Sequence, residues 1–229
     1  MAKFKEVGSK MNFKRITIIS GHFGSGKTNV AVNLALELKK TKQDVAILDI
    51  DIVNPYFRTK DSMNELIENG IRLICSEYAN TNVDIPALPQ QIYSVTDSLN
   101  TSFIIDVGGD DRGALALGRL APKIKEENDY DMYYVVNMFR PLTSDSKSAI
   151  EVMREIEFAC KMKFTGIINN SNLGLETTEE DVLNSVEYAN SVAKEAGLKV
   201  VLTTVESSLF SGLKDKIENL YSLTLQKKL

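Results

Sequence analysis

The chain is poor in the residues that build metal sites and covalent cross-links. Its 229 residues include no tryptophan, one histidine and two cysteines, Cys75 and Cys160, which lie far apart and in no Cys-x-x-Cys pair. This usage argues against a disulfide scaffold, a zinc site and an iron–sulfur scaffold, all of which need clustered thiolates. It is typical of a reducing compartment, and we expect a cytoplasmic protein.

Long apolar runs and excess positive charge are also missing. No run approaches the roughly 18 apolar residues of a membrane span, and the basic N-terminus MAKFKEVGSKMNFKR has no apolar centre of the kind found in signal peptides. The net charge is −4, which disfavours general nucleic-acid binding. We therefore expect neither a membrane protein nor a protein that coats nucleic acid.

Short apolar runs recur along the chain, with room for a helix between most of them. Most are continuously apolar, which is typical of strands buried on both faces of a parallel sheet. The runs are 15–20, 44–50, 71–75, 102–107, 132–137, 164–169 and 199–204. They predict an α/β fold of three layers, with a doubly wound, mostly parallel sheet of about seven strands.

Helical patterns lie between these runs. Val30, Leu34 and Leu38 are spaced by four, an apolar stripe runs through 145–162, and the segment 177–197 opens with Thr178 and Asp181, which resemble a capping box. No linker or repeat is visible, so we expect one domain over residues 1–229, with 1–13 peripheral or disordered.

An apolar stripe also lies near the C-terminus, and it consists of Leu209, Leu213, Ile217 and Leu220 or Tyr221. It predicts a last helix that packs on the protein's own sheet rather than on a membrane.

The stretch between the first predicted strand and the first helix carries the most specific motif. Gly21, Gly26, Lys27 and Thr28 meet the pattern G-x-x-x-x-G-K-[ST] of a phosphate-binding loop. Glycines let backbone N–H groups turn toward phosphate oxygens, the lysine neutralises phosphate charge, and the threonine hydroxyl suits Mg²⁺. The alternative is a glycine-rich turn that binds nothing. The nucleotide-binding residues predicted here are Gly21, His22, Phe23, Gly24, Ser25, Gly26, Lys27, Thr28 and Asn29.

Carboxylates follow two of the predicted strands. Asp106 begins an Asp-x-x-Gly pattern that ends at Gly109, which is typical of a nucleotide-sensing switch, although strands often end in such a turn. Asp49 and Asp51 lie two apart and so share one face of an extended chain. Such a pair suits a metal or a water nucleophile. The alternative is that one of the two caps a loop.

Together, the loop, D-x-D-x-x-x-P after the second strand and D-x-G-G after the fourth resemble the SIMIBI class of P-loop NTPases. Within that class the chain resembles the CobQ/CobB/MinD/ParA nucleotide-binding family, from Lys14 to about Phe210. The resemblance implies ATP and Mg²⁺ as ligands and a catalytic set of Lys27, Asp51 and Asp106. Asp51 would position or activate the attacking water, and the metal would be held by Thr28, Asp49 and Asp106.

The resemblance also suggests where the base would lie. In the family an asparagine after a late strand commonly reads adenine, and Asn169 and Asn170 occupy such a place here. Val205 and Glu206 would close over the base. No N-K-x-D guanine motif is visible.

The loop departs from the family pattern at its second residue. Many of these ATPases carry a lysine there that crosses a sandwich dimer to reach the partner's phosphates, whereas this chain has His22 followed by Phe23. An imidazole is shorter and mostly neutral at pH 7. It either contacts phosphate as a neutral donor or only shapes the loop. We expect that any homodimer does not depend on His22.

Other residues near the motifs are candidates for contact with a partner or substrate. They are Asn54, Pro55, Tyr56, Arg58 and Arg112. Either arginine could act as an arginine finger, and an ordinary surface ion pair is an equal alternative.

Three functions fit the motifs. One is an ATPase whose slow hydrolysis switches the assembly, delivery or positioning of a protein partner. The second is an ATP-dependent ligase for a small acid, similar to dethiobiotin or cobyrinate synthetases. The third is a nucleotide-binding regulator without turnover. The pair Asp49 and Asp51 favours the switch, because two carboxylates serve a water nucleophile.

Overall fold

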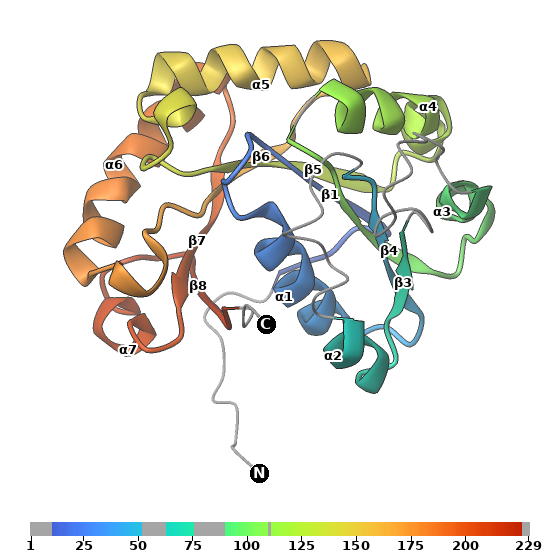
Figure 1. Ribbon diagram of the computed structural model, residues 1–229, viewed down its shortest axis with the longest axis horizontal. Helices are drawn as coiled ribbons and strands as arrows, with labels where there is room; N and C mark the ends of the chain where they lie inside the picture. The colour runs from blue at the N-terminus through green and yellow to red at the C-terminus, as the bar shows by residue number, and fades with distance from the viewer. Residues whose placement is uncertain (1–10, 52–62, 76–89, 110, 226–229) are drawn as a thin grey trace, which may run out of the picture.

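The computed structural model describes residues 11–51, 63–75, 90–109 and 111–225, and within these ranges eight strands form one sheet (Figure 1). The strand order is β3-β2-β4-β1-β5-β6-β7-β8, and every neighbouring pair is parallel. The strands are β1 (Ile16–Ser20), β2 (Val45–Asp49), β3 (Arg72–Ile74), β4 (Ser102–Asp106), β5 (Tyr130–Val136), β6 (Gly166–Asn169), β7 (Val200–Glu206) and β8 (Leu220–Leu223).

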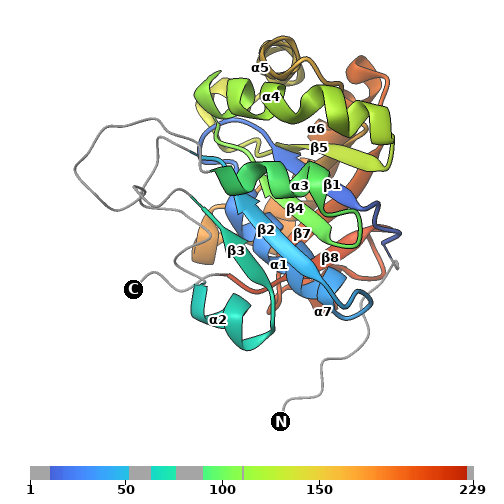
Figure 2. The ribbon, with the colours of Figure 1, turned by 90° about the vertical axis from the view of Figure 1, so that its right-hand side faces the viewer.

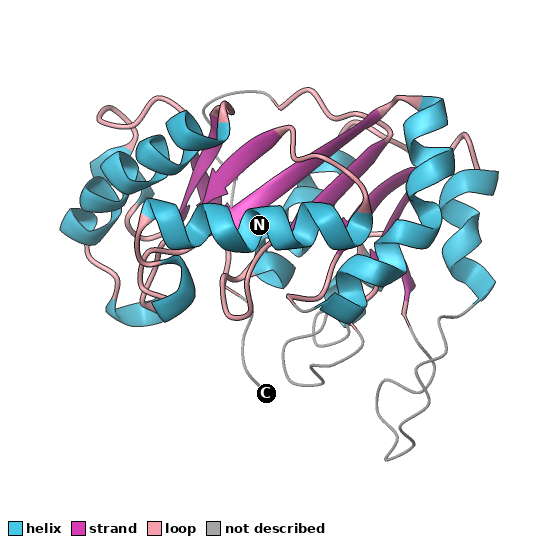
Figure 3. Ribbon diagram, turned by 90° about the horizontal axis from the view of Figure 1, so that it is seen from above, coloured by secondary structure: helices cyan, strands magenta, loops and turns pink. Residues whose placement is uncertain are grey.

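Helices cover both faces of this sheet, as Figure 2 shows from the edge and Figure 3 from above. The helices α4 (Asp111–Glu127), α5 (Ser146–Cys160) and α6 (Glu179–Ala196) lie on one face, and α1 (Lys27–Lys39) and α2 (Met63–Glu68) lie on the other. The shorter elements are η3 (Gln90–Tyr93), α3 (Ser94–Asp97), η4 (Pro141–Thr143), η5 (Gly174–Glu176) and α7 (Phe210–Leu213). The predicted three-layer, doubly wound α/β fold is therefore confirmed.

The helical patterns in the sequence form helices at the expected places. Val30, Leu34 and Leu38 are fully buried on α1, so the four-residue spacing marks the face that packs on the sheet. Helix α6 begins with the expected capping box, in which Thr178 and Asp181 each accept a hydrogen bond from the other residue's backbone N–H. These local signals fix the ends of the helices as well as their faces.

The predicted C-terminal helix is wrong. Only the single turn α7 is helical, and β8 then pairs with β7 to extend the sheet by one strand. Leu213, Ile217 and Leu220 are buried with Val182 and Val205 in one small apolar cluster. The apolar spacing therefore reflects a turn and a strand that cover the end of the core, and the sequence pattern alone does not separate this from a helix.

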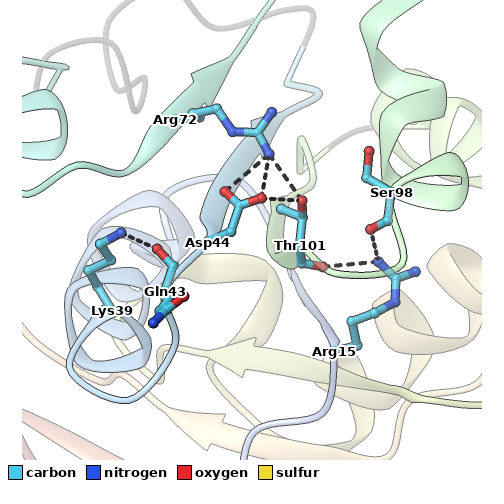
Figure 4. A network of polar contacts seen from close by, with 7 residues as sticks. All are labelled: Arg15, Lys39, Gln43, Asp44, Arg72, Ser98 and Thr101. Atoms are coloured by element: carbon cyan, nitrogen blue, oxygen red, sulfur yellow. Dashed lines mark hydrogen bonds and ion pairs between the residues drawn. The ribbon is translucent and has the colours of Figure 1, made fainter.

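A polar network connects the amino ends of the four strands β1, β2, β3 and β4 (Figure 4). Thr101 donates to Asp44 at 2.6 Å and accepts from the guanidinium of Arg72 at 3.1 Å. The hydrogen bond from Thr101 is the largest cause that lowers the pKa of Asp44, and Arg72 reinforces it against the opposing effect of burial. Arg15 donates to the carbonyls of Ser98 and Thr101. These contacts fix the edge of the sheet opposite to the phosphate loop.

Among the described helices, none combines the length and apolar character that crossing a membrane requires.

Candidate nucleotide-binding site

The phosphate loop connects β1 to α1 at the carboxyl edge of the sheet. Its turn is closed by a hydrogen bond from the N–H of Ser25 to the carbonyl of His22 at 3.2 Å, and Lys27 Nζ donates to the same carbonyl at 3.2 Å. Gly26 is the N-cap of α1 and has no side chain with which to bond the first backbone N–H groups of the helix. The first turn also contains no acidic residue. The positive end of the helix is thus presented to an anion.

Gly26 is required by its surroundings as well as by its conformation. Its φ is +85°, and a Cβ at this position would lie 2.2 Å from Nδ2 of Asn170. That nitrogen donates to the carbonyl of Ser25 at 2.6 Å, and Oδ1 of Asn170 accepts from Thr204 at 2.5 Å. Asn170 therefore connects the phosphate loop to β7, and a larger residue at position 26 would strain the backbone and displace this amide.

Two carboxylates meet beside this loop because of the strand order. Asp49 and Asp106 are register partners at the ends of β2 and β4, and both are buried. Oδ1 of Asp49 accepts from the backbone N–H of Asp51 at 3.0 Å. Adjacent carboxyl ends of parallel strands are where doubly wound sheets bind ligands.

Burial dominates the electrostatics of Asp106. It raises the pKa of this carboxyl to about 6, against the opposing effects of the Lys27 ammonium and the Thr28 hydroxyl, while the charge of Asp51 raises it further. Within the described residues, neither oxygen of Asp106 meets a hydrogen-bond donor in good geometry, and the same holds for the buried hydroxyls of Ser20 and Ser25. Buried polar atoms without partners need an explanation, and a ligand that brings donors and cations is one.

The donor set fits Mg²⁺. Thr28, Asp49 and Asp106 offer only oxygen atoms, which this hard cation prefers. In the part of the chain that the structure describes, no group of three His, Cys, Asp or Glu side chains could hold a metal alone. Mg²⁺ is commonly held by one or two carboxylates together with substrate phosphates. The site is therefore of the kind that binds metal and phosphate together.

Asp106→Asn should stabilise the metal-free protein by about 1–3 kcal/mol at neutral pH, because it removes a fully buried ionised carboxylate whose desolvation outweighs its attraction to Lys27 and Thr28. The pKa of Asp106 is about 6 in the folded state against an ordinary 3.8. The wild type therefore loses stability as the pH rises from about 4 to about 6, and the variant should gain less at acidic than at neutral pH. Urea unfolding with a chelator, at both pH values, measures this.

The exposed Asp215 provides the matched control. Asp215→Asn should change the free energy of unfolding by less than about 0.5 kcal/mol. Equal or lower stability of Asp106→Asn would contradict a net cost of burying this carboxylate.

The loop after β4 is in direct contact with the phosphate loop. A Cβ at Gly109 would lie 2.5 Å from the backbone nitrogen of Phe23 and 3.0 Å from the carbonyl carbon of His22. Only glycine permits this approach. The last residue of the Asp-x-x-Gly pattern is therefore in contact with the loop whose ligand it would sense.

A small cavity opens beyond Asn170, between the loops that follow β6 and β7. Its lining includes Asn170, Val205 and Glu206, which the family resemblance places near the base, and also Asn172 and Thr204, which the sequence does not single out. Its volume of about 10 Å³ holds about one water molecule, so contact of these residues with a base stays a prediction. Asn169 does not line it. Its fully buried amide donates to Ser185 and accepts from the N–H of Ser171. The sequence does hold a signal for Asn172, because the polar run that begins at Asn169 and Asn170 continues through residues 171 and 172.

The remaining predicted residues are distributed around this edge. Nδ1 of His22 lies 2.9 Å from the carbonyl of Phe23, and Phe23 itself is 56% exposed. A carbonyl can only accept, so Nδ1 carries the hydrogen, and Nε2 of a neutral His22 is an acceptor. Arg112 is exposed in the first turn of α4. The predicted contact residues Asn54, Pro55, Tyr56 and Arg58 lie outside the described residues.

An all-parallel, doubly wound sheet with a phosphate-loop motif after β1 is the fold of P-loop NTPases, and the comparisons place its likeness in the SIMIBI class. Residues 12–76, which run from before β1 to just after β3, match the family model described as ParA, NUBPL iron-transfer P-loop NTPase. None of the curated proteins compared matches the chain.

Solved structures of FtsY share the fold. The chain is similar to FtsY from Mycoplasma mycoides, with a TM-score of 0.54, 17% identity and coverage of 86% of this chain and 61% of that one. The signal recognition particle receptor FtsY from Elizabethkingia anophelis in complex with GDP has a TM-score of 0.54 and 15% identity, and the match covers 96% of this chain and 63% of that one. FtsY from Thermotoga maritima has a TM-score of 0.54 and 17% identity, and the match covers 89% of this chain and 65% of that one. The chain thus spans less than two thirds of each of these proteins.

Proposed function

We propose that this protein binds ATP with Mg²⁺ and hydrolyses it slowly, as a switch that controls the assembly, delivery or positioning of a protein partner. The observation that carries this proposal is the pair Asp49 and Asp106 at the ends of neighbouring strands, beside Lys27 of the phosphate loop. The phosphate-loop motif and the match of residues 12–76 to the ParA, NUBPL iron-transfer P-loop NTPase model support the nucleotide-binding part. ATP, the metal and the switch role are the proposal's own.

Each residue of the site has a distinct task in this proposal. The N-terminus of α1 and Lys27 hold the β- and γ-phosphates. Thr28, Asp49 and Asp106 would hold Mg²⁺, which would supply positive charge to neutralise the phosphates. Asp51 lies close enough to influence the pKa of Asp106, and it orients the attacking water.

ATP is proposed over GTP because of the family resemblance, and a competition experiment tests this choice. The structure from E. anophelis is a complex with GDP, so guanine is the alternative that matters. Displacement of a fluorescent nucleotide by ATP and by GTP should show tighter binding of ATP. Tighter binding of GTP would show that the base is guanine and not adenine. The proposed phosphate-binding residues would stay the same.

Phosphate release tests the reaction itself. The purified protein should release phosphate from Mg-ATP slowly, and a panel of small carboxylic acids should not change the rate. Stimulation by one acid would favour an ATP-dependent ligase instead of a switch. Nucleotide binding without any phosphate release would favour a regulator without turnover.

His22→Ala should leave the oligomeric state unchanged. Nδ1 of His22 donates to the carbonyl of Phe23, so in the neutral tautomer Nε2 has no hydrogen to offer a phosphate. Sedimentation of wild type and variant, each with ADP and with a non-hydrolysable ATP analogue, measures this. An ATP-specific dimer that disappears in the variant would show that His22 becomes charged and takes over the role of the family's lysine.

A further inference from the structure

Arg140 is a cation at the rim of the phosphate loop that the sequence motif does not include. It lies between β5 and η4, and β5 pairs directly with β1, so that both loops leave the same edge of the sheet. Nε of Arg140 donates to the carbonyl of Gly24 at 2.8 Å. Gly24 is in the middle of the phosphate loop, so the guanidinium is in direct contact with it.

The backbone that carries Arg140 is fixed by buried polar residues. Asn137, which is 1% exposed, accepts from the N–H of Arg140 at 3.1 Å through its carbonyl and from the N–H of Phe139 at 3.0 Å through its side chain. The fully buried Thr143 donates to the same carbonyl at 2.8 Å. This arrangement exists without a ligand, so little ordering is needed when one binds.

The outer part of the guanidinium is available. Arg140 is exposed, and its terminal nitrogens Nη1 and Nη2 have no hydrogen-bond or ion-pair partner within residues 11–51, 63–75, 90–109 and 111–225. The hydrogen bond from Nε holds the group against the loop. A planar fork with a full charge is well suited to bind phosphate oxygens.

The strand order β2-β4-β1-β5 places this arginine on one flank of the loop and the carboxylates Asp49 and Asp106 on the other. A phosphate chain on the loop would lie between them. Within the loop, Lys27 is the one side chain with a permanent positive charge, because position 22 is a histidine.

We propose that Arg140 contacts the outer phosphates of a nucleoside triphosphate bound to the same chain and supplies the positive charge that His22 does not. The proposal rests on the proposed function, since it needs a triphosphate on the loop. An arginine placed in this way, within the same chain, stabilises the charge that develops when the γ-phosphate is transferred.

The test compares affinities for Mg²⁺ complexes of ADP and a non-hydrolysable ATP analogue by calorimetry. Arg140→Ala should weaken binding of the analogue about tenfold or more and that of ADP by less than about twofold. Arg140→Lys should recover only part of the loss, because it keeps the charge without the fork. Arg119→Ala, which removes another exposed arginine on α4, should change neither affinity.

Thermal unfolding of the nucleotide-free variants separates a ligand contact from a structural one. The midpoint for Arg140→Ala should equal that of the wild type. Equal weakening of both nucleotides with a lower midpoint would show that Arg140 only supports the loop, and this would overturn the inference, as would unchanged affinities. If the wild type itself bound neither nucleotide, the proposed function would fail first.

Discussion

Lys27→Ala should lower the affinity for ATP by about two orders of magnitude or more, which is the loss expected when a charged contact to two phosphates is removed. Lys27 is 6% exposed at the start of α1, and its ammonium already lies beside the loop, where it lowers the pKa of Asp106. The side chain is therefore positioned for phosphate before any ligand arrives. Calorimetric titration with Mg-ATP measures the change.

Lys40→Ala is the matched control, since Lys40 lies just past the other end of the same helix and is exposed. It should bind ATP as the wild type does. Circular dichroism should show that both variants are folded. Wild-type affinity of Lys27→Ala would contradict the placement of the phosphates on this loop.

Asp51→Ala should bind ATP with little change and hydrolyse it about 10²-fold more slowly, the usual contribution of a residue that orients or activates water. Asp51 lies two residues after the end of β2, is half-buried, and raises the pKa of Asp106 through its charge. It thus lies near the proposed metal without being deeply enclosed. Phosphate release under saturating Mg-ATP measures turnover, and calorimetry measures binding.

Asp215→Ala removes an exposed aspartate after α7 and should leave both quantities unchanged. Full turnover of Asp51→Ala would assign the water to another group. A parallel loss of binding and turnover would instead make Asp51 part of the nucleotide or metal site.

The sequence was most informative where a local pattern has one structural solution. Short continuous apolar runs predicted strands β1 to β7, because this composition and length are typical of strands buried on both faces. The loop from Gly21 to Thr28 was predicted with its strand and helix. Asp49 and Asp106 were expected at strand ends, and the strand order then made them neighbours.

What the sequence did not show depends on contacts between distant segments. The stripe of Leu213, Ile217 and Leu220 suited a helix as well as a turn and strand, and only packing against Val182 and Val205 distinguishes them. No spacing rule connects Asn170 to Ser25.

Arg140 was missed for the same reason. Its partner Gly24 is more than a hundred residues away in the chain, and the contact arises from the adjacency of β1 and β5. An isolated arginine after a strand has no sequence signal that separates it from a surface residue. The phosphate-loop motif could therefore be predicted from the sequence, whereas the contacts that support the loop could not.

The metal dependence of ATP binding tests the central claim most directly. The dissociation constant of the wild type for ATP should be measured by calorimetry with Mg²⁺ and again with an excess of chelator. The account predicts clear binding with Mg²⁺ and much weaker binding without it, because Asp49 and Asp106 would then face phosphate charge unscreened. Absence of binding under both conditions, or equal affinity in both, would contradict it.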